Sequence, residues 1–190
     1  MPAPHFYKVE GFILKRKNIG EGDRIITIFT KEYGKMRLMA KGIRRVTSRR
    51  APYLELFNHV RLLIHRGKIM DMIAEAEMVE PFNTIRNDLT RVSIAYYFCE
   101  LVDVLLPEHQ EHADVFALLV TSFGEIPSYV SEQLPIFAGR VSFALLGALG
   151  FLAKGKEPVA TELVAYIERI AEKRLKTPKF YRLLTRTAAI

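Results

Sequence analysis

The fold is decided by residues 20–41, which read GEGDRIITIFTKEYGKMRLMAK. Arg24–Thr30 is rich in isoleucine and threonine, and β-branched side chains of this kind are typical of a strand. In Lys35–Lys41, Met36, Leu38 and Ala40 alternate with more polar residues. This period of two predicts a half-buried strand with a basic outer face formed by Lys35, Arg37, Met39 and Lys41.

Similar segments lie on both sides of this stretch. Tyr7–Lys17, Tyr53–His65 and Ile69–Val79 are rich in strand-forming residues, and Gly42–Pro52 is polar and predicts a loop or short helix. Five short strands with one longer connection after the third predict a five-stranded OB-type β-barrel. A small open sheet is the alternative arrangement of the same strands.

The apolar pattern changes its period after Pro81. Ile85, Leu89, Val92, Tyr96, Cys99, Val102 and Leu106 form one helical stripe. We expect helices over Ile85–Leu106, Ala113–Gly124, Pro127–Phe151 and Pro158–Leu175, and a short one over Lys179–Thr187. The predicted fold class is therefore α+β, with an OB-type nucleic-acid-binding barrel in residues 1–81 and an all-helical domain in residues 82–190.

The positive charge is concentrated in the first part of the chain. Residues 1–82 hold 16 Lys and Arg against 9 Asp and Glu, whereas residues 83–190 hold 12 of each. A cationic module joined to a neutral one predicts a polyanionic partner, either nucleic acid or an anionic membrane.

Composition and motifs argue against several other classes of protein. The single cysteine excludes an internal disulfide and a cysteine-rich zinc site. No signal peptide pattern and no membrane-spanning apolar run is found, so we expect a cytoplasmic protein. No phosphate loop, nucleophile elbow or paired-carboxylate motif is present, and we expect no enzyme activity, catalytic residue or cofactor.

The strongest candidate binding segment is Lys35–Arg50, which contains seven cations and no acidic residue. Phosphates would relieve the mutual repulsion of these cations, whereas a solvated loop is the simpler explanation. Two neighbouring strand ends could extend the same surface. The predicted nucleic-acid-binding residues of the barrel are Lys15, Arg16, Lys17, Arg24, Lys35, Arg37, Lys41, Arg44, Arg45, Arg49 and Arg50.

A second basic cluster lies near residue 190, and it also has a simpler explanation. Lys173, Arg174, Lys176, Lys179, Arg182 and Arg186 follow Glu172 without a further acidic residue. Cations also stabilise the C-terminal ends of helices electrostatically. We include Lys176, Lys179 and Arg182 among the predicted nucleic-acid-binding residues.

Three further groups of residues are better explained by structure than by chemistry. Glu108-His-Gln-Glu-His112 resembles a metal site only superficially, and we expect no metal. Tyr33 and Tyr53 could stack on bases, but aromatic residues of a small barrel usually belong to the core. Cys99 lies on an apolar helical face, so we expect it in the core.

Seven segments of the chain are informative as an ordered set: Gly20–Thr30, Tyr33–Arg37, Ala40–Arg45, Glu77–Phe82, Glu100–Pro107, Leu145–Phe151 and Lys173–Phe180. In this order they resemble segments of the bacterial RecO family of recombination mediators. Many members carry four cysteines after the leucine-glycine segment, where this chain has Lys154-Gly-Lys-Glu157. We therefore expect the zinc module to be missing.

The resemblance implies an accessory factor of DNA repair that binds single- and double-stranded DNA. Such a factor anneals complementary strands and helps to load RecA onto DNA covered by single-strand-binding protein. The implied partners are RecR, the C-terminal tail of single-strand-binding protein and, indirectly, RecA. Two alternatives remain from the sequence: an RNA-binding OB protein of translation or transcription, and a structural adaptor.

Overall fold

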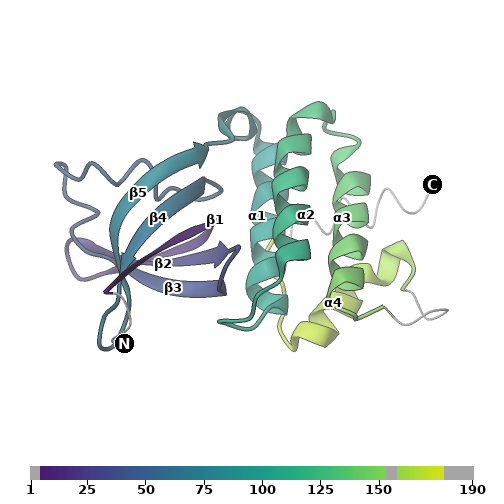
Figure 1. The fold of residues 1–190 in the computed structure, drawn as a ribbon. Coiled ribbons are helices and arrows are strands. Elements are labelled where there is room, and N and C mark those ends of the chain that lie inside the picture. The colour runs from purple at the N-terminus through teal and green to yellow at the C-terminus, as the bar shows by residue number, and fades with distance from the viewer. Residues whose placement is uncertain (1–4, 153–157, 178–190) are drawn as a thin grey trace. The chain divides into compact units, whose positions relative to one another are not determined.

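A computed structural model describes residues 5–152 and 158–177, and its first part is a five-stranded barrel (Figure 1). The strands are β1 (Phe6–Ile19), β2 (Asp23–Thr30), β3 (Gly34–Ala40), β4 (His59–His65) and β5 (Met72–Glu80). They close in the order β1-β2-β3-β5-β4, and the closing β3–β5 pair is parallel at Met39 and Met72. The expected OB-type barrel is therefore confirmed, and the open sheet is wrong.

The barrel core comes from the inward-facing rows of all five strands. Ile13 lies opposite Ile28, which lies opposite Met36, and all three are buried. Long β1 pairs with both β2 and β4, and Gly11 lets it approach β2 closely. A Cβ on Gly11 would lie 2.4 Å from the carbonyl oxygen of Phe29, so no other residue fits there.

The fourth and fifth strands begin later than the sequence predicts. The expected strand over Tyr53–His65 starts only at His59, because residues 53–57 form turns. The Asn58 side-chain amide donates hydrogen bonds to the carbonyls of Pro52 and Tyr53, and Leu54 is fully buried. This apolar segment therefore packs against the barrel core as a folded loop rather than as strand.

The chain divides into two compact units whose boundaries are not simply sequential. Leu106–Phe116 groups with Met1–Phe82, and the second unit contains Asn83–Leu105 and Ala117–Ile190. Within the first unit, Glu108 forms a parallel bridge with Lys35 at the start of β3. We call residues 106–112 the strap; the sequence pattern did not reveal this role.

The remaining elements are helical, and three of them differ from the expected bounds. They are η1 (Asn83–Asn87), α1 (Leu89–Leu105), α2 (Ala113–Glu125), η2 (Ile126–Ser128), α3 (Leu134–Ala148), η3 (Ala160–Glu162) and α4 (Leu163–Ala171). The helix expected from Ile85 begins only at Leu89, after a short 3₁₀ helix. The helix expected over Pro127–Phe151 is interrupted, because Pro127 lies in η2 and α3 begins at Leu134. The helix expected from Pro158 begins at Leu163 and ends before Glu172, whose φ of 50° is left-handed.

The core of the second unit is built on α1. Tyr97 is fully buried, and its hydroxyl lies 2.9 Å from the Ser142 hydroxyl of α3. Cys99 is also buried, which confirms its core position, and burial raises the pKa of its thiol. The expected helix over Lys179–Thr187 and the segment Lys154–Glu157 lie outside the described residues.

Among the described residues, no helix has both the length and the apolar character needed to cross a bilayer.

Candidate nucleic-acid interface

The outer side of β1, β2 and β3 carries a row of exposed cations. Lys15 lies opposite Thr27, which lies opposite Arg37, so their side chains share one face. Lys17 follows two residues later on the same side, and all three cations are exposed. We call Lys15, Lys17 and Arg37 the basic face.

The loop after β3 brings further cations next to the β1–β2 turn. The Arg44 backbone amide donates to the carbonyl of Gly22 at 3.0 Å, and its guanidinium donates to the carbonyl of Gly20 at 3.1 Å. The Gly42 amide donates to the Asp23 carboxylate at 2.7 Å. The fold therefore places exposed cations of this loop, which we call the basic loop, beside the end of β1: Lys41, Arg44, Arg45 and Arg49.

Arg16 and Arg24 have partners that reduce their availability. Both belong to inward-facing rows, since Arg16 lies opposite Ile26 and Arg24 opposite Ala40. Both are half-buried and form ion pairs with Glu55. The two arginines therefore close one end of the barrel around a shared carboxylate, which favours a structural role.

Lys35 and Arg50 are both largely covered, and neither lies on an open surface. Lys35 faces outward by register, but the strap pairs with its backbone and only 7% of the residue is exposed. The half-buried Arg50 guanidinium donates hydrogen bonds to the backbone carbonyls of Lys41, Ile73 and Ala74. Arg50 thus fastens the basic loop to β5, and the expectation that Arg50 is exposed is wrong. Lys35 faces outward as expected, but the strap covers it.

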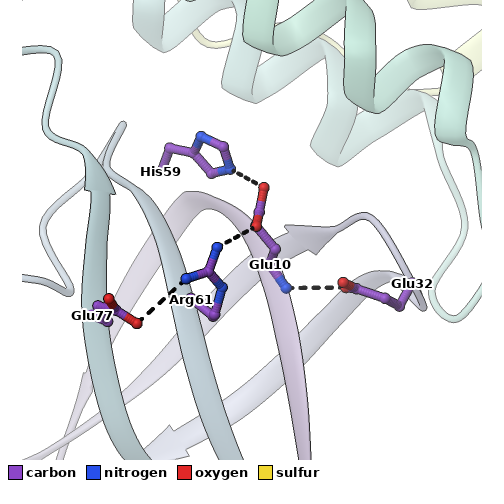
Figure 2. Close-up of polar contacts among 5 residues, drawn as sticks. All are labelled: Glu10, Glu32, His59, Arg61 and Glu77. Atoms are coloured by element: carbon purple, nitrogen blue, oxygen red, sulfur yellow. Dashed lines mark hydrogen bonds and ion pairs between the residues drawn. The ribbon is translucent and has the colours of Figure 1, made fainter.

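The outer side of β1, β4 and β5 has the opposite character (Figure 2). Glu10, Arg61 and Glu77 lie in one cross-strand row, with Glu10–Arg61 and Arg61–Glu77 separations of 3.1 and 3.5 Å. Exposed Glu75 and Glu80 occupy neighbouring outward positions of β5. On this side the carboxylates outnumber the exposed cations Lys8 and Arg61, which makes the basic face the better candidate interface.

His59 is the one buried member of this acidic side shown in Figure 2. Its Nε2 lies 3.1 Å from a Glu10 carboxylate oxygen, and its ring stacks on Phe12 at 4.7 Å. Burial lowers the pKa of His59, and the neighbouring Glu10 carboxylate opposes that change only in part. The histidine therefore favours its neutral form in the folded protein.

The two tyrosines considered for base stacking differ in the structure. Tyr53 is half-buried and packs against the barrel core, as expected for a structural residue. Tyr33 is 38% exposed and meets the ring of Tyr7 edge-on at 5.3 Å. Only Tyr33 therefore presents a partly open aromatic surface.

The C-terminal cluster is described only in its first part. Lys173, Arg174 and Lys176 are exposed, whereas Lys179, Arg182 and Arg186 lie outside the described residues. The backbone amides of Lys176 and Thr177 donate to the Glu100 carboxylate of α1 at 2.5 and 3.2 Å. These hydrogen bonds fix the start of the cluster to α1 and leave the Lys176 side chain exposed.

The segment Glu108–His112, which resembles a metal site in the sequence, has a structural role in the described part of the chain. Glu108 forms an ion pair with Arg37, with Nε and Oε1 2.8 Å apart. Across residues 5–152 and 158–177, no group of three or more His, Cys, Asp or Glu side chains is arranged to hold a metal ion. The Glu108–His112 segment contributes to the strap.

One feature of the surface could not be anticipated from the sequence. A pocket of about 260 Å³ opens beside β3 and is lined by Met36, Arg37, Ile69, Met70, Asp71, Glu108 and His109. Its walls come from three segments that are far apart in the chain: β3, the β4–β5 loop and the strap. No local pattern of residues signals such a pocket.

Comparison with protein families matches both halves of the chain. Residues 4–82 match the profile described as the N-terminal part of recombination protein O, and residues 86–162 match its C-terminal part. The two matches lie in sequence order and together cover most of the chain.

Individual relatives give the same result. The chain is 40% identical over 148 residues to the DNA repair protein RecO of Symbiobacterium thermophilum, covering 76% of this chain and 57% of that protein. It is 38% identical over 145 residues to the Heliobacterium modesticaldum protein of the same name, covering 76% and 52%. The Pelotomaculum thermopropionicum protein is 36% identical over 114 residues, covering 60% and 44%. The chain thus spans about half the length of these relatives.

Proposed function

This chain belongs to the recombination protein O family, and from that premise we propose that it is a DNA-binding accessory factor of repair and recombination. In this proposal it binds single- and double-stranded DNA through the barrel and anneals complementary strands. It also helps to load RecA onto DNA covered by single-strand-binding protein, together with RecR and the tail of that protein.

The observation that supports DNA binding best is the separation of charge around the barrel. The cations of the basic face and the basic loop lie at β1–β3 and beside the β1–β2 turn. The acidic residues Glu75, Glu77 and Glu80 lie on β5. Uniform positive charge would serve solubility alone, whereas an oriented cationic surface suits a phosphate backbone.

The test compares two double variants with the same loss of charge. Lys17→Gln with Arg45→Gln removes exposed cations from the basic face and the basic loop. Lys8→Gln with Lys31→Gln removes exposed cations elsewhere on the barrel. Arg50 is left intact because it fastens the basic loop to β5.

The first pair should weaken binding of single-stranded DNA and flatten its salt dependence by about 1.4 in logarithmic slope, about 0.7 for each lost phosphate contact. The control pair should leave the slope nearly unchanged. Fluorescence anisotropy titrations at several salt concentrations measure both quantities. Equal slopes for the two pairs would contradict an oriented DNA surface, and tighter binding of matched RNA would favour the RNA-binding alternative.

A further inference from the structure

The pocket beside β3 continues the basic face. Arg37 belongs to both, because it shares a cross-strand row with Lys15 and also lines the pocket. A strand whose phosphates follow the basic face therefore passes the pocket mouth at Arg37.

The pocket walls are apolar on one side and acidic on the other. Ile69 is fully exposed at 100%, and Met70 lies next to it in the β4–β5 loop. Glu108 and Asp71 supply carboxylates. Both carboxylates repel a phosphate, and the Glu108 carboxylate has a second oxygen that can accept a hydrogen bond from an uncharged N–H group. The apolar side chains favour a flat, weakly hydrated surface.

The β4–β5 loop is held in place before any ligand arrives. The Asp71 carboxylate accepts hydrogen bonds from the Gly67 amide at 3.0 Å and from the Tyr7 hydroxyl at 2.5 Å. The Asp71 carbonyl accepts a hydrogen bond from the Met39 amide of β3 at 2.8 Å. Ile69 is therefore presented from an anchored loop.

The strap wall is fixed in a similar way. The His109 amide donates to the Lys35 carbonyl at 2.9 Å, and Arg37 is paired with Glu108. Because both walls are anchored, little conformational entropy is lost in ordering them when a ligand enters the pocket.

We propose that this pocket takes one nucleobase of single-stranded DNA, with the base against Ile69 and Met70 while the phosphates stay on the basic face. The inference rests on the proposed function and deepens it. A paired base cannot enter, so the pocket selects single strands over duplex. Apolar side chains that contact unstacked bases are an established means of holding nucleic acid without reading its sequence.

The test separates bases from phosphates. Affinity is measured by anisotropy for a short thymidine oligonucleotide and for an abasic oligonucleotide of the same length and charge. The protein should bind the base-bearing strand roughly fivefold more tightly or better, the lower end of what one base contact contributes. The salt slopes should be the same for both strands.

Matched variants identify the pocket as the source of that preference. Ile69→Ser should remove most of the preference, and Ile69→Tyr should keep or increase it because aromatic rings stack on bases. Ile136→Ser is the control, since Ile136 is also exposed, at 58%, but lies on α3 and belongs neither to the pocket lining nor to the basic surface. Circular dichroism checks that each variant is folded.

Three outcomes would overturn the proposal. They are equal affinity for the two oligonucleotides, equal losses in the Ile69 and Ile136 variants, and a stronger preference on matched uridine RNA than on DNA. Equal affinity with a normal salt slope would leave the DNA-binding function intact and remove only the base pocket. Failure to bind either strand would instead contradict the proposed function.

Discussion

At the residue scale, the arginines of the barrel have different roles, which depend on their hydrogen-bond and ion-pair partners. Arg45 and Arg49 stay exposed in the basic loop, whereas Arg50 donates to three backbone carbonyls and Arg16 shares Glu55 with Arg24. The sequence gives the charge of each residue, but it does not show which hydrogen-bond or ion-pair partner that residue has. Mutational tests of DNA binding must therefore separate exposed arginines from bonded ones.

His59 gives a pH-dependent prediction at the same scale. Its folded-state pKa is lowered by burial, so below its unfolded value of about 6.5 the unfolded chain binds a proton that the folded protein resists. The free energy of unfolding should therefore fall as the pH decreases from about 7.5 to about 5.5. Urea denaturation at these pH values measures this loss.

The matched variant for this prediction is His59→Gln, which cannot titrate and can still donate to Glu10. Its free energy of unfolding should change less with pH than that of the original protein, whatever its absolute stability. The same loss in both proteins would assign the pH dependence to other groups.

At the element scale, the strap determines which residues of β3 are accessible to a ligand. It covers the start of β3 at Lys35 and places Glu108 against Arg37. Gly34 makes the approach possible, since its φ is 66° and a Cβ there would lie 1.8 Å from the Gln110 carbonyl oxygen. The alternation of Lys35–Lys41 correctly predicted which residues face outward, but not what covers them.

Replacing Gly34 should therefore displace the strap. Gly34→Ala should lower the free energy of unfolding by about 3 kcal/mol or more, because the left-handed backbone and the collision with Gln110 act together. Gly20→Ala is the control, since Gly20 has a φ of 53° but nothing within 4 Å of an added Cβ. It should cost only about 1–2 kcal/mol. Chemical denaturation measures the free energy of unfolding of both variants. Equal decreases would mean that the strap moves away from the added Cβ without destabilising the fold.

At the scale of the whole molecule, the sequence predicted the architecture better than the interface. The five strand segments, among them the isoleucine-rich segment and the alternating Lys35–Lys41, were sufficient to predict the barrel. Strand period and turn chemistry are local properties of the sequence. The pocket, the Glu55 pairs and the burial of Lys35 depend on segments far apart in the chain. Tyr53–Asn58 was misassigned because a short apolar run fits a strand and a packed loop equally well.

The two basic clusters give a prediction about annealing, which is a property of the whole chain. If both the barrel and the C-terminal cluster contact DNA, one molecule holds two strands and raises their effective concentration. Replacing Lys176, Lys179, Arg182 and Arg186 by Gln should then lower single-strand affinity modestly and the annealing rate more. Anisotropy and the annealing of labelled complementary oligonucleotides measure the two effects.

The outcomes of that experiment distinguish three roles for the cluster. Equal losses in both measurements would mean that it adds only nonspecific charge. No loss in either would assign it to stabilisation of a helix end. A larger loss of annealing supports the two-strand mechanism.

The charge separation around the barrel also has a kinetic consequence. Cations at β1–β3 and carboxylates on β5 give this unit an electric dipole moment. In the field of a polyanion such a dipole turns the protein before contact, within a screening distance of about 10 Å at 0.1 M salt. Under the proposed function, a larger fraction of collisions with DNA then begins with the basic side forward, and the same charge separation that strengthens binding also speeds association.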